Sequence, residues 1–251
     1  MTEYAESDQS VIHIIFVHGW AMLTSDWEIL IALIRQELPD AVITSFNCYD
    51  QSVGKINLRK NYNYIWIGHS FGFLRLWLEH NLIDNEISAA ISINSFTYLP
   101  QSVDNSGLRK GNLSKVNIEK MLSGLQKAPE QTLKYFYRQA GLSKDQIKGH
   151  LAYFRRTRRL NLLQEELMLM QNADVRQAIG KYRIPILSLA ADRDKIVNQE
   201  LWQQSFARIC PANQNHIELK QINSSSHCLH LAEPAWCAKA IVCFIRAYSI
   251  F

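Results

Sequence analysis

A serine lies between two glycines in the segment Gly68-His69-Ser70-Phe71-Gly72. The G-x-S-x-G pattern alone is only modestly specific, because with Gly and Ser each at about 7% of residues a chain of this length contains it by chance roughly 0.09 times. Here it directly follows the apolar run Tyr64–Ile67 and directly precedes an apolar, helix-like run that ends at Trp77. A strand, a tight turn and a helix in this order would project the hydroxyl from the end of a sheet. The sequence therefore predicts Ser70 to be a nucleophile.

A serine hydroxyl is a weak nucleophile at neutral pH and needs a histidine base that a carboxylate orients. After a turn of this kind, the acid and then the histidine follow along the chain, at the ends of later strands. The run Ile184–Ala190 leads into Asp192 and Asp194. Both carboxylates could reach the end of that strand, so the residues alone leave two candidates for the acid.

The histidine is expected after the apolar run His216–Ile222. His216 begins that run and would lie at the opposite end of the sheet. His227 falls on the loop before the last predicted helix and is the expected base. His230 lies four residues before Pro234, where packing or capping is the more common role, and is the reserve candidate.

Acyl transfer through a serine also needs two N–H donors at the oxygen that becomes negatively charged, and removal of one such donor typically costs about 2.7–4 kcal/mol. The amide of Phe71, next to the nucleophile, is one expected donor. The other is the amide of Trp20, which follows His18-Gly19 after the first apolar run. We expect no metal and no cofactor, because the remaining histidines lack ligand spacing and no Gly-rich phosphate loop is present.

The elements that must position these residues alternate along the chain, as in a mostly parallel sheet flanked by helices. Apolar runs rich in Val, Ile, Phe and Tyr predict strands at Val11–Val17, Ala41–Phe46, Tyr62–Ile67, Ile87–Ile93, Ile184–Ala190 and His216–Ile222. Helical patterns predict helices from Ser25, as N-cap, to Leu38, from Phe71 to about Asn81, and at Gln199–Ile209 and Pro234–Ala247.

One long stretch, between Asn94 and Arg183, breaks this alternation. It shows no convincing strand, and its periodicity predicts helices at Ile118–Leu125, Glu130–Gln139, Lys144–Tyr153 and Leu160–Gln171. Because the stretch is too long for a loop, we expect a helical cap over the strand ends. The predicted organisation is an α/β core of residues 1–95 and 183–251 with a helical cap of residues 96–182.

Charge is distributed unevenly along the 251 residues. Residues 105–160 contain 13 Lys or Arg and 3 Asp or Glu, whereas the rest of the chain contains 14 basic and 20 acidic residues. No apolar run reaches the length of about 18 residues that a membrane helix needs, and we expect neither a membrane nor a nucleic acid as partner. The acidic start of the chain, with Glu3, Glu6 and Asp8, is unlike a secretory signal, so we expect a cytoplasmic location.

These motifs together resemble the pimeloyl-acyl-carrier-protein methyl ester esterases, the carboxylesterases of biotin synthesis, which have an α/β-hydrolase fold. The likeness covers most of the chain. The segment His18-Gly19-Trp20, followed by Trp27, is similar to the HGW…W opening of that family. The segment Glu166–Arg176 is similar to the pattern G-L-x-x-L-x-x-x-D-L-R that closes the family's cap, and this match is the more discriminating one.

The resemblance also distinguishes between the two candidate acids. The family spacing G-x-x-D-x-x-V after the acid-bearing strand fits Asp194 and Val197, with Ala191 at the glycine position. It therefore implies Asp194 as the acid and leaves Asp192 as a loop or helix-capping residue.

The function that the resemblance implies is hydrolysis of the methyl ester of a pimeloyl chain carried on acyl carrier protein. Acyl carrier proteins are acidic, so a basic surface on the cap would steer and orient the carrier. The implied contacts to substrate or carrier are Trp20, Phe136, Lys144, Lys148, Arg155 and Arg159, with Arg156 and Arg158 beside them. The alternative interpretation of such a charge run is a solvated helix face.

Two other functions remain open at this point. One is a general short-chain carboxylesterase or thioesterase, which would use the same three residues without any dependence on a carrier. The other is a non-catalytic binding protein with a hydrolase fold, against which an apparently complete set of Ser70, Asp194 and His227 argues.

Overall fold

The computed structural model describes residues 11–49, 58, 62–78, 87–100, 113–209 and 216–248. Some features expected from the sequence fall outside these residues. They are the acidic segment before residue 11, the end of the helix expected to reach Asn81, and two of the basic residues, Arg109 and Lys110.

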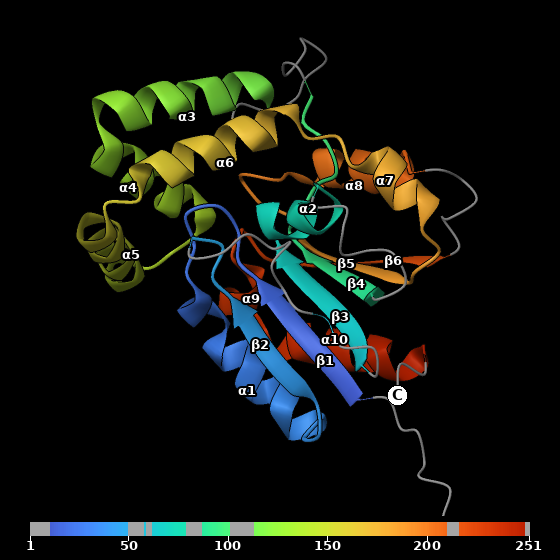
Figure 1. Cartoon of the computed structure of the whole chain (residues 1–251). Coiled ribbons are helices and arrows are strands. Elements are labelled where there is room, and N and C mark those ends of the chain that lie inside the picture. The colour runs from blue at the N-terminus through green and yellow to red at the C-terminus, as the bar shows by residue number, and fades with distance from the viewer. Residues whose placement is uncertain are drawn as a thin grey trace, which may run out of the picture.

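In the part of the chain that the structure describes, six parallel strands form one sheet in the order β2-β1-β3-β4-β5-β6 (Figure 1). The strands are β1 (Val11–Val17), β2 (Val42–Phe46), β3 (Tyr62–His69), β4 (Ile87–Ile93), β5 (Ile186–Ala191) and β6 (Ile217–Ile222). All six predicted strands are therefore confirmed, with ends that differ by one or two residues. Because every pairing is parallel, the carboxyl ends of the strands share one edge, and the segments after them meet there.

Helices cover both faces of this sheet because the strands are apolar on both faces. In β1, Ile14 points to one face, where α1 (Glu28–Glu37) and α10 (Pro234–Ala247) pack against it. Ile15 points to the other face, which α2 (Phe71–Leu78) and α8 (Gln199–Ala207) cover.

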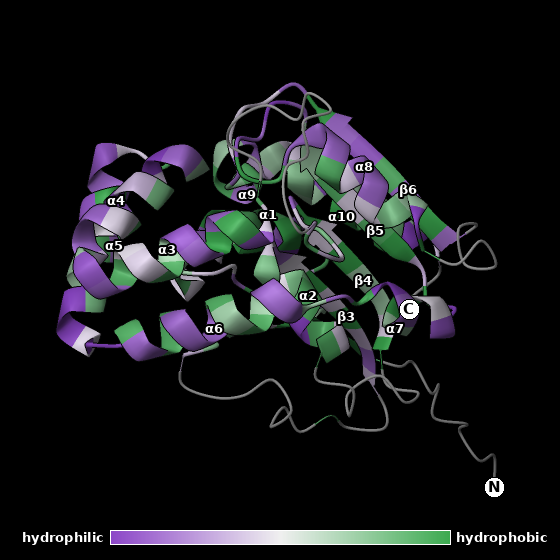
Figure 2. Ribbon diagram, turned by 90° about the horizontal axis from the view of Figure 1, so that it is seen from above, coloured by the Kyte–Doolittle hydropathy of each residue, from purple (hydrophilic) through white to green (hydrophobic). Residues whose placement is uncertain are grey.

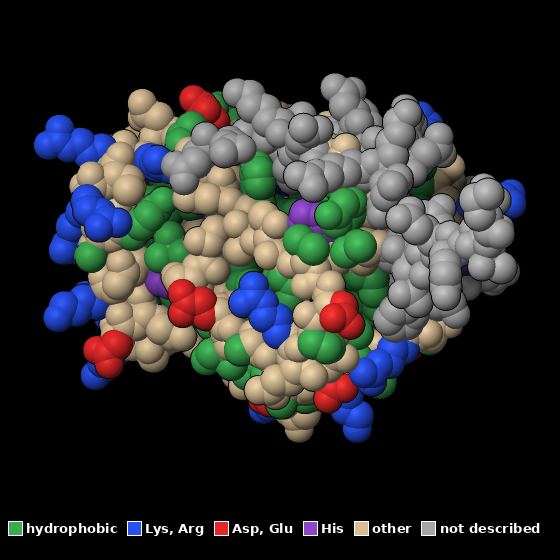
Figure 3. Space-filling view, turned by 60° about the horizontal axis from the view of Figure 1, so that its bottom comes forward, with side chains coloured by type: hydrophobic (Ala, Val, Ile, Leu, Met, Phe, Trp, Pro, Cys, Tyr) green, Lys and Arg blue, Asp and Glu red, His purple; other side chains and the backbone are tan. Residues whose placement is uncertain are grey.

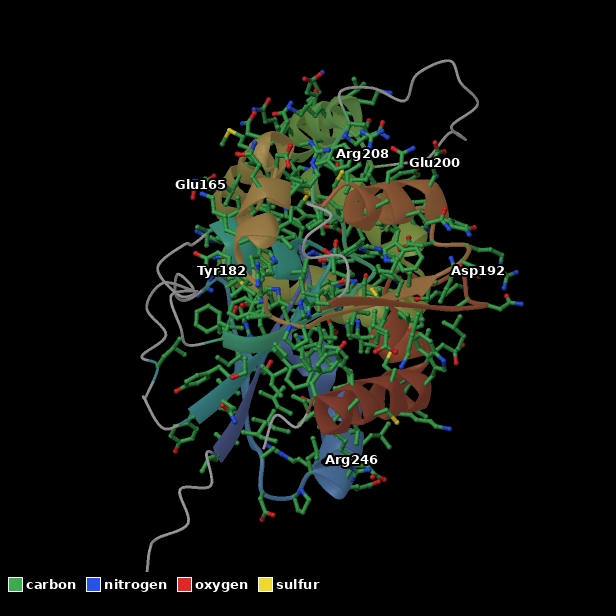
Figure 4. All side chains as sticks on the ribbon, turned by 90° about the vertical axis from the view of Figure 1, so that its right-hand side faces the viewer. Glu165, Tyr182, Asp192, Glu200, Arg208 and Arg246 are labelled. Atoms are coloured by element: carbon green, nitrogen blue, oxygen red, sulfur yellow. The ribbon has the colours of Figure 1, made fainter. Side chains whose placement is uncertain are left out.

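Figure 2 shows the hydrophobic residues concentrated along β3, β4 and β5, between these two helical layers. At the surface, Arg246 of α10 donates hydrogen bonds to the carbonyl oxygen of Glu37, at 3.0 Å, and to its Oε2, at 3.1 Å (Figure 4). This contact joins the ends of the two helices that cover one face.

Five helices lie between β4 and β5 in the described part of the chain, and the first four are called the cap helices below. They are α3 (Lys115–Lys127), α4 (Pro129–Ala140), α5 (Lys144–Thr157) and α6 (Leu160–Asn172), and they lie beyond the carboxyl edge of the sheet (Figure 1). The four helices predicted in this stretch are thus present. The only pairing of strand type within its described residues is an isolated bridge between Tyr98 and Asp174. The division into a core domain and a cap domain stays a prediction.

Local sequence explains where the cap helices begin and end. Pro129 opens α4, where its missing N–H costs nothing, and Gly141 ends that helix with a left-handed φ of 87°. Ser143 then caps α5 in a capping box, because its hydroxyl accepts from Gln146 N–H while the Gln146 side chain accepts from Ser143 N–H.

Ser25 is not the N-cap that the sequence predicts. A short 3₁₀ helix, η1 (Thr24–Trp27), precedes α1, and Leu23 occupies the N-cap position. The N–H of Leu23 donates to the Asp26 carboxylate at 2.9 Å, so a side chain of the first turn accepts from the N-cap residue and no side chain caps the first N–H groups of η1. Two short helices, α7 (Arg176–Lys181) and α9 (Leu229–Ala232), were also not predicted, since runs of four to six residues carry little periodicity.

Candidate active site

Ser70 occupies a sharp turn between β3 and α2. Its φ of 51° lies in the left-handed region, which few residues other than glycine adopt. A Cβ atom at Gly68 would lie 2.3 Å from the backbone nitrogen of Phe73, and one at Gly72 would lie 2.3 Å from the carbonyl oxygen of Val17. Both glycines are therefore required by close backbone contacts, and the turn is the strained strand–turn–helix junction expected from the sequence.

The backbone of Ser70 is held from the neighbouring strand. Its N–H donates to the carbonyl oxygen of Ile93, at the end of β4, over 2.9 Å. Its carbonyl oxygen accepts from the Ser95 hydroxyl at 2.7 Å. One contact comes from the last residue of β4 and the other from Ser95, two residues further, so the position of the serine depends on the end of β4 and the residues that follow it.

Asp194 and His227, the acid and base expected from the sequence, are brought together. His227 Nδ1 lies 2.7 Å from Asp194 Oδ2, and both side chains are buried. The other oxygen, Oδ1, accepts from the N–H groups of Ile196 at 2.7 Å and of Val197 at 3.2 Å. A carboxylate that accepts at both oxygens assigns the proton of the neutral ring to Nδ1, which leaves Nε2 as the basic nitrogen.

The Ser70 hydroxyl makes no hydrogen bond to the His227 ring among the described residues. In structures without substrate such bonds are often long, and they tighten when substrate binds.

The alternative candidates have other partners. Asp192 Oδ1 accepts from the N–H of Ser224 at 2.9 Å and so shapes the loop that leads to His227, and its side chain lies at the outer end of the β5 loop (Figure 4). His230 is buried on α9 and its ring lies 4.2 Å from that of Trp27. Asp192 is thus a loop residue and His230 a packing residue.

Three other buried histidines surround the site and are held neutral. Burial lowers the pKa of His18 and of His230 to about 4, and it lowers the pKa of His69 well below its usual value. His69 Nε2 lies 2.9 Å from the carbonyl oxygen of His227 and donates to it. Burial therefore favours the neutral form of these three rings.

The two expected oxyanion donors lie at the same edge of the sheet. Val17 of β1 pairs with Gly68 of β3, so the segments that continue to Trp20 and to Ser70 leave neighbouring strand ends. Within the described residues, neither the Trp20 nor the Phe71 backbone N–H donates a hydrogen bond. Both amides are consequently free to bind a developing oxyanion.

The side chain of Trp20 connects this edge to the cap helices. Its indole N–H donates to the carbonyl oxygen of Leu163 in α6 at 2.9 Å. Its ring meets the ring of Phe136 in α4 edge to face, with centroids 4.7 Å apart. Phe136 therefore packs a cap helix against Trp20 of the core, and its expected contact with substrate stays a prediction.

The basic residues expected to make contacts lie at the outer side of the cap helices. Lys144 and Lys148 are exposed on α5, and Arg159 is half-buried at the start of α6. Arg155 is exposed and forms an ion pair with Glu130, whose Oε2 accepts from its Nε at 3.0 Å. The structure therefore gives Arg155 a partner within the chain, whereas the two lysines point to solvent.

Sequence reasoning missed two buried contacts between ionisable side chains that join the core to the cap helices. Arg75 of α2 donates to Glu166 Oε1 of α6 at 2.8 Å, and His150 of α5 lies 3.0 Å from Asp26 Oδ2 of η1. The sequence contains an indication of the Arg75 contact. An arginine inside the apolar run after the nucleophile must be buried, and a buried arginine requires an anionic partner. The sequence contains no such indication for His150, since nothing near it distinguishes it from a surface residue.

Comparison with known proteins shows the fold. No model of a protein family matches the chain, and no curated protein matches it. Among solved structures, a bromoperoxidase from Bacillus anthracis superposes with a TM-score of 0.74 at 16% identity, over 94% of this chain and 92% of the other. A hydrolase from Oleispira antarctica gives a TM-score of 0.72 at 16% identity, over 94% and 91% of the two chains. An esterase from Exiguobacterium antarcticum gives 0.70 at 13% identity, over 94% and 92%.

The chain therefore has the α/β-hydrolase fold, as expected, and identities this low establish the fold alone. Two further properties concern the described residues. No group of three or more His, Cys, Asp or Glu side chains there is arranged to hold a metal ion. No helix there has the length and apolar composition needed to cross a membrane.

Proposed function

We propose that this protein is a serine carboxylesterase that uses Ser70 as nucleophile, His227 as general base and Asp194 as the orienting acid. The observation that carries the proposal is the buried 2.7 Å contact between Asp194 and His227, at the same sheet edge as the strained turn of Ser70. This chain order and these positions fit the known arrangement of such groups on an α/β-hydrolase fold. Solved structures described as esterases and hydrolases share the fold.

In the proposed reaction, His227 Nε2 takes the proton of the Ser70 hydroxyl as its oxygen attacks the ester carbonyl carbon. The carbonyl oxygen becomes negatively charged and binds the amides of Trp20 and Phe71. The protonated ring then gives its proton to the leaving alcohol, and an acyl-Ser70 ester remains. A water molecule, deprotonated by the same ring, hydrolyses this ester and releases the acid.

A carrier-bound acyl ester is the substrate class that we propose, and specifically the methyl ester of pimeloyl-acyl carrier protein. The resemblance of the cap-closing segment Glu166–Arg176 supports it, and so does the charge of α4 and α5. Residues 129–159 include eight Lys or Arg and two Asp or Glu. Figure 3 shows Lys and Arg side chains gathered along the edge of the molecule formed by these helices. An acidic carrier would be steered toward such an edge.

Hydrolysis of p-nitrophenyl acyl esters tests the reaction. We expect turnover by the wild-type protein and its loss in Ser70→Ala, with unchanged thermal unfolding. A fluorophosphonate should label the wild-type protein at Ser70 and leave the variant unlabelled. Full activity of Ser70→Ala, or no turnover of any ester by the wild-type protein, would contradict the proposal.

The substrate class needs a separate experiment. The gene should restore growth without biotin to a strain that lacks the methyl ester esterase of this pathway, and the Ser70→Ala gene should not. Turnover of p-nitrophenyl esters without this rescue would retain the esterase and rule out the specific substrate.

A further inference from the structure

Ile93, the last residue of β4, and the next two residues, Asn94 and Ser95, hydrogen-bond Ser70, the loop of His227 and the end of the strand that leads to Asp194. Ile93 and Ser95 bind the backbone of Ser70, as described above. Asn94, between them, reaches the segments that carry the acid and the base. Sequence reasoning assigned no role to Asn94, although a polar residue at the carboxyl end of a strand is where functional side chains gather in this type of sheet.

The Asn94 side chain makes three hydrogen bonds, all of them to backbone groups. Its Oδ1 accepts from the N–H of Ala191, at the end of β5, over 2.8 Å. Its Nδ2 donates to the carbonyl oxygen of Ser226 at 2.8 Å and to that of His227 at 2.7 Å. Only one orientation of the amide satisfies one donor and two acceptors, so the assignment of oxygen and nitrogen is fixed by the partners.

The backbone of Asn94 is also special. Its φ of 45° lies in the left-handed region, and its side chain is buried. Its N–H donates to the carbonyl oxygen of Leu189 at 2.8 Å, which extends the pairing of β4 with β5 by one residue. The turned backbone directs the side chain away from this pairing and toward the loop of His227. A conformation of this kind persists where the surrounding contacts determine it, and it is common at functional sites.

We propose that Asn94 is a positioning residue that fixes the loop of His227 relative to the β5 end that carries Asp194. The proposal rests on the proposed function of these residues. Through its two carbonyl acceptors and one amide donor, Asn94 sets the separation of two segments whose side chains must meet at 2.7 Å. A second donor, His69 Nε2, shares the His227 carbonyl oxygen, but the His69 side chain makes no hydrogen bond to β5 among the described residues. The two segments also bond directly, since the N–H of Arg193 donates to the carbonyl oxygen of Ser224 at 3.0 Å and the N–H of Ser224 donates to Asp192 Oδ1. Among the described residues, Asn94 is the one that hydrogen-bonds both the end of β5 and the carbonyl oxygen of His227 itself.

Three variants separate this role from simple packing. Asn94→Gly removes the side chain and relieves the left-handed backbone, so it keeps the best chance of folding. Asn94→Asp keeps the shape but replaces the donating NH₂ with an oxygen that faces two carbonyl oxygens. Ser92→Ala is the matched control, because the Ser92 hydroxyl donates to the Ser188 hydroxyl at 2.7 Å between the same two strands and does not contact the loop of His227.

The measurements are kcat and KM for a p-nitrophenyl ester, the rate of Ser70 labelling by a fluorophosphonate, and the thermal unfolding temperature. We expect Asn94→Gly and Asn94→Asp to lower kcat and the labelling rate by about 10- to 100-fold, since misplacement by about 1 Å can have effects of this size. KM should change less than about twofold, because ester binding does not involve Asn94. Ser92→Ala should keep kcat even where its unfolding temperature falls.

The outcomes are distinguishable. A wild-type protein that neither turns over esters nor is labelled would overturn the proposed function and this inference with it. An active wild-type protein together with an unchanged kcat in a folded Asn94→Gly or Asn94→Asp would overturn the inference alone. Equal losses of kcat in Ser92→Ala and Asn94→Gly would also overturn it, because they would show a general effect of strand pairing.

Discussion

The imidazole of His150, in α5, lies between two oxygen acceptors. Its Nε2 is 3.0 Å from Asp26 Oδ2 and its Nδ1 is 2.8 Å from the carbonyl oxygen of Gln146. The ring therefore has an oxygen within hydrogen-bond distance of each nitrogen, and its contact with the carboxylate lowers the pKa of Asp26 against the effect of burial. Both side chains are buried, and the pair joins a cap helix to the segment that precedes α1 in the core.

We expect His150→Ala to lower the free energy of unfolding by about 3–5 kcal/mol, because it leaves the Asp26 carboxylate buried without its side-chain partner. Urea unfolding measures the loss. The double variant His150→Ala/Asp26→Asn should lose less than the sum of the two single variants, since no charge is then left unpaired. Arg155→Ala, which breaks an exposed pair with Glu130, is the control and should change stability little. Equal stability of His150→Ala and Arg155→Ala would contradict the importance of the buried pair.

The second buried pair predicts a pH dependence. Burial raises the pKa of Glu166 to about 7, against the opposing effect of Arg75. The folded chain therefore keeps this proton up to about pH 7, whereas the unfolded chain releases it near its ordinary value of 4.5. Because the folded state binds the extra proton in this window, the free energy of unfolding should fall as pH rises through it. At about 1.4 kcal/mol for each pKa unit, the total is on the order of 3 kcal/mol.

The variant Glu166→Gln should remove this contribution to the pH dependence. Its unfolding temperature, relative to that of the wild-type protein, should rise steadily from pH 5 to pH 7 and then level off. Glu130→Gln is the control. The exposed carboxylate of Glu130 pairs with Arg155, which lowers the pKa of Glu130, so Glu130 titrates below this pH window. Parallel curves for Glu166→Gln and the wild-type protein would show that Glu166 is ionised throughout.

The sequence predicted the sheet and the main site residues because these follow local rules. Apolar runs gave the strands, and the order of Ser70, Asp194 and His227 followed from the positions of those runs. Asn94, Arg75 and the pairing of Asp26 with His150 depend instead on contacts between residues 91 to 133 positions apart. Periodicity carries no information on such separations, so these residues emerged only when the strands and the cap helices were placed in space.

The tight turn of Ser70 predicts that alanine is not tolerated at Gly72, and Gly149 is the matched control position. A Cβ at Gly72 would meet the carbonyl oxygen of Val17 at 2.3 Å, whereas one at Gly149, in the exposed face of α5, would meet nothing within 4 Å. We expect Gly72→Ala to lower the free energy of unfolding by about 1–3 kcal/mol or more and to abolish ester hydrolysis, because α2 must shift from the end of β1. Gly149→Ala should raise the free energy of unfolding by about 0.5–1 kcal/mol, since alanine favours the helix.

Thermal unfolding and p-nitrophenyl ester hydrolysis measure both effects. Activity in Gly149→Ala should equal that of the wild-type protein. A fully active Gly72→Ala would mean that the turn of the nucleophile tolerates a side chain, and the strain argued for Ser70 would then be wrong.

The exposed lysines of α5 provide the test of carrier docking. Reversal of charge in Lys144→Glu/Lys148→Glu should lower kcat/KM for a carrier-bound ester by about tenfold or more at low salt, because complementary charge accelerates encounter with an acidic carrier. The same variant should hydrolyse a p-nitrophenyl ester at the wild-type rate. Arg155→Glu should have a smaller effect on the carrier-bound ester, since Glu130 already accepts from Arg155 and reduces its free positive charge.

Lys239→Glu is the matched control, because Lys239 is exposed on α10, which covers the sheet and is not one of the cap helices. It should leave kcat/KM for both substrates unchanged. The loss in the α5 variant should also diminish as salt is raised, since exposed charges are screened beyond about 8 Å at physiological ionic strength. An equal loss in Lys239→Glu would indicate a general effect of net charge. An unchanged kcat/KM in the α5 variant would leave its two lysines as a solvated helix face.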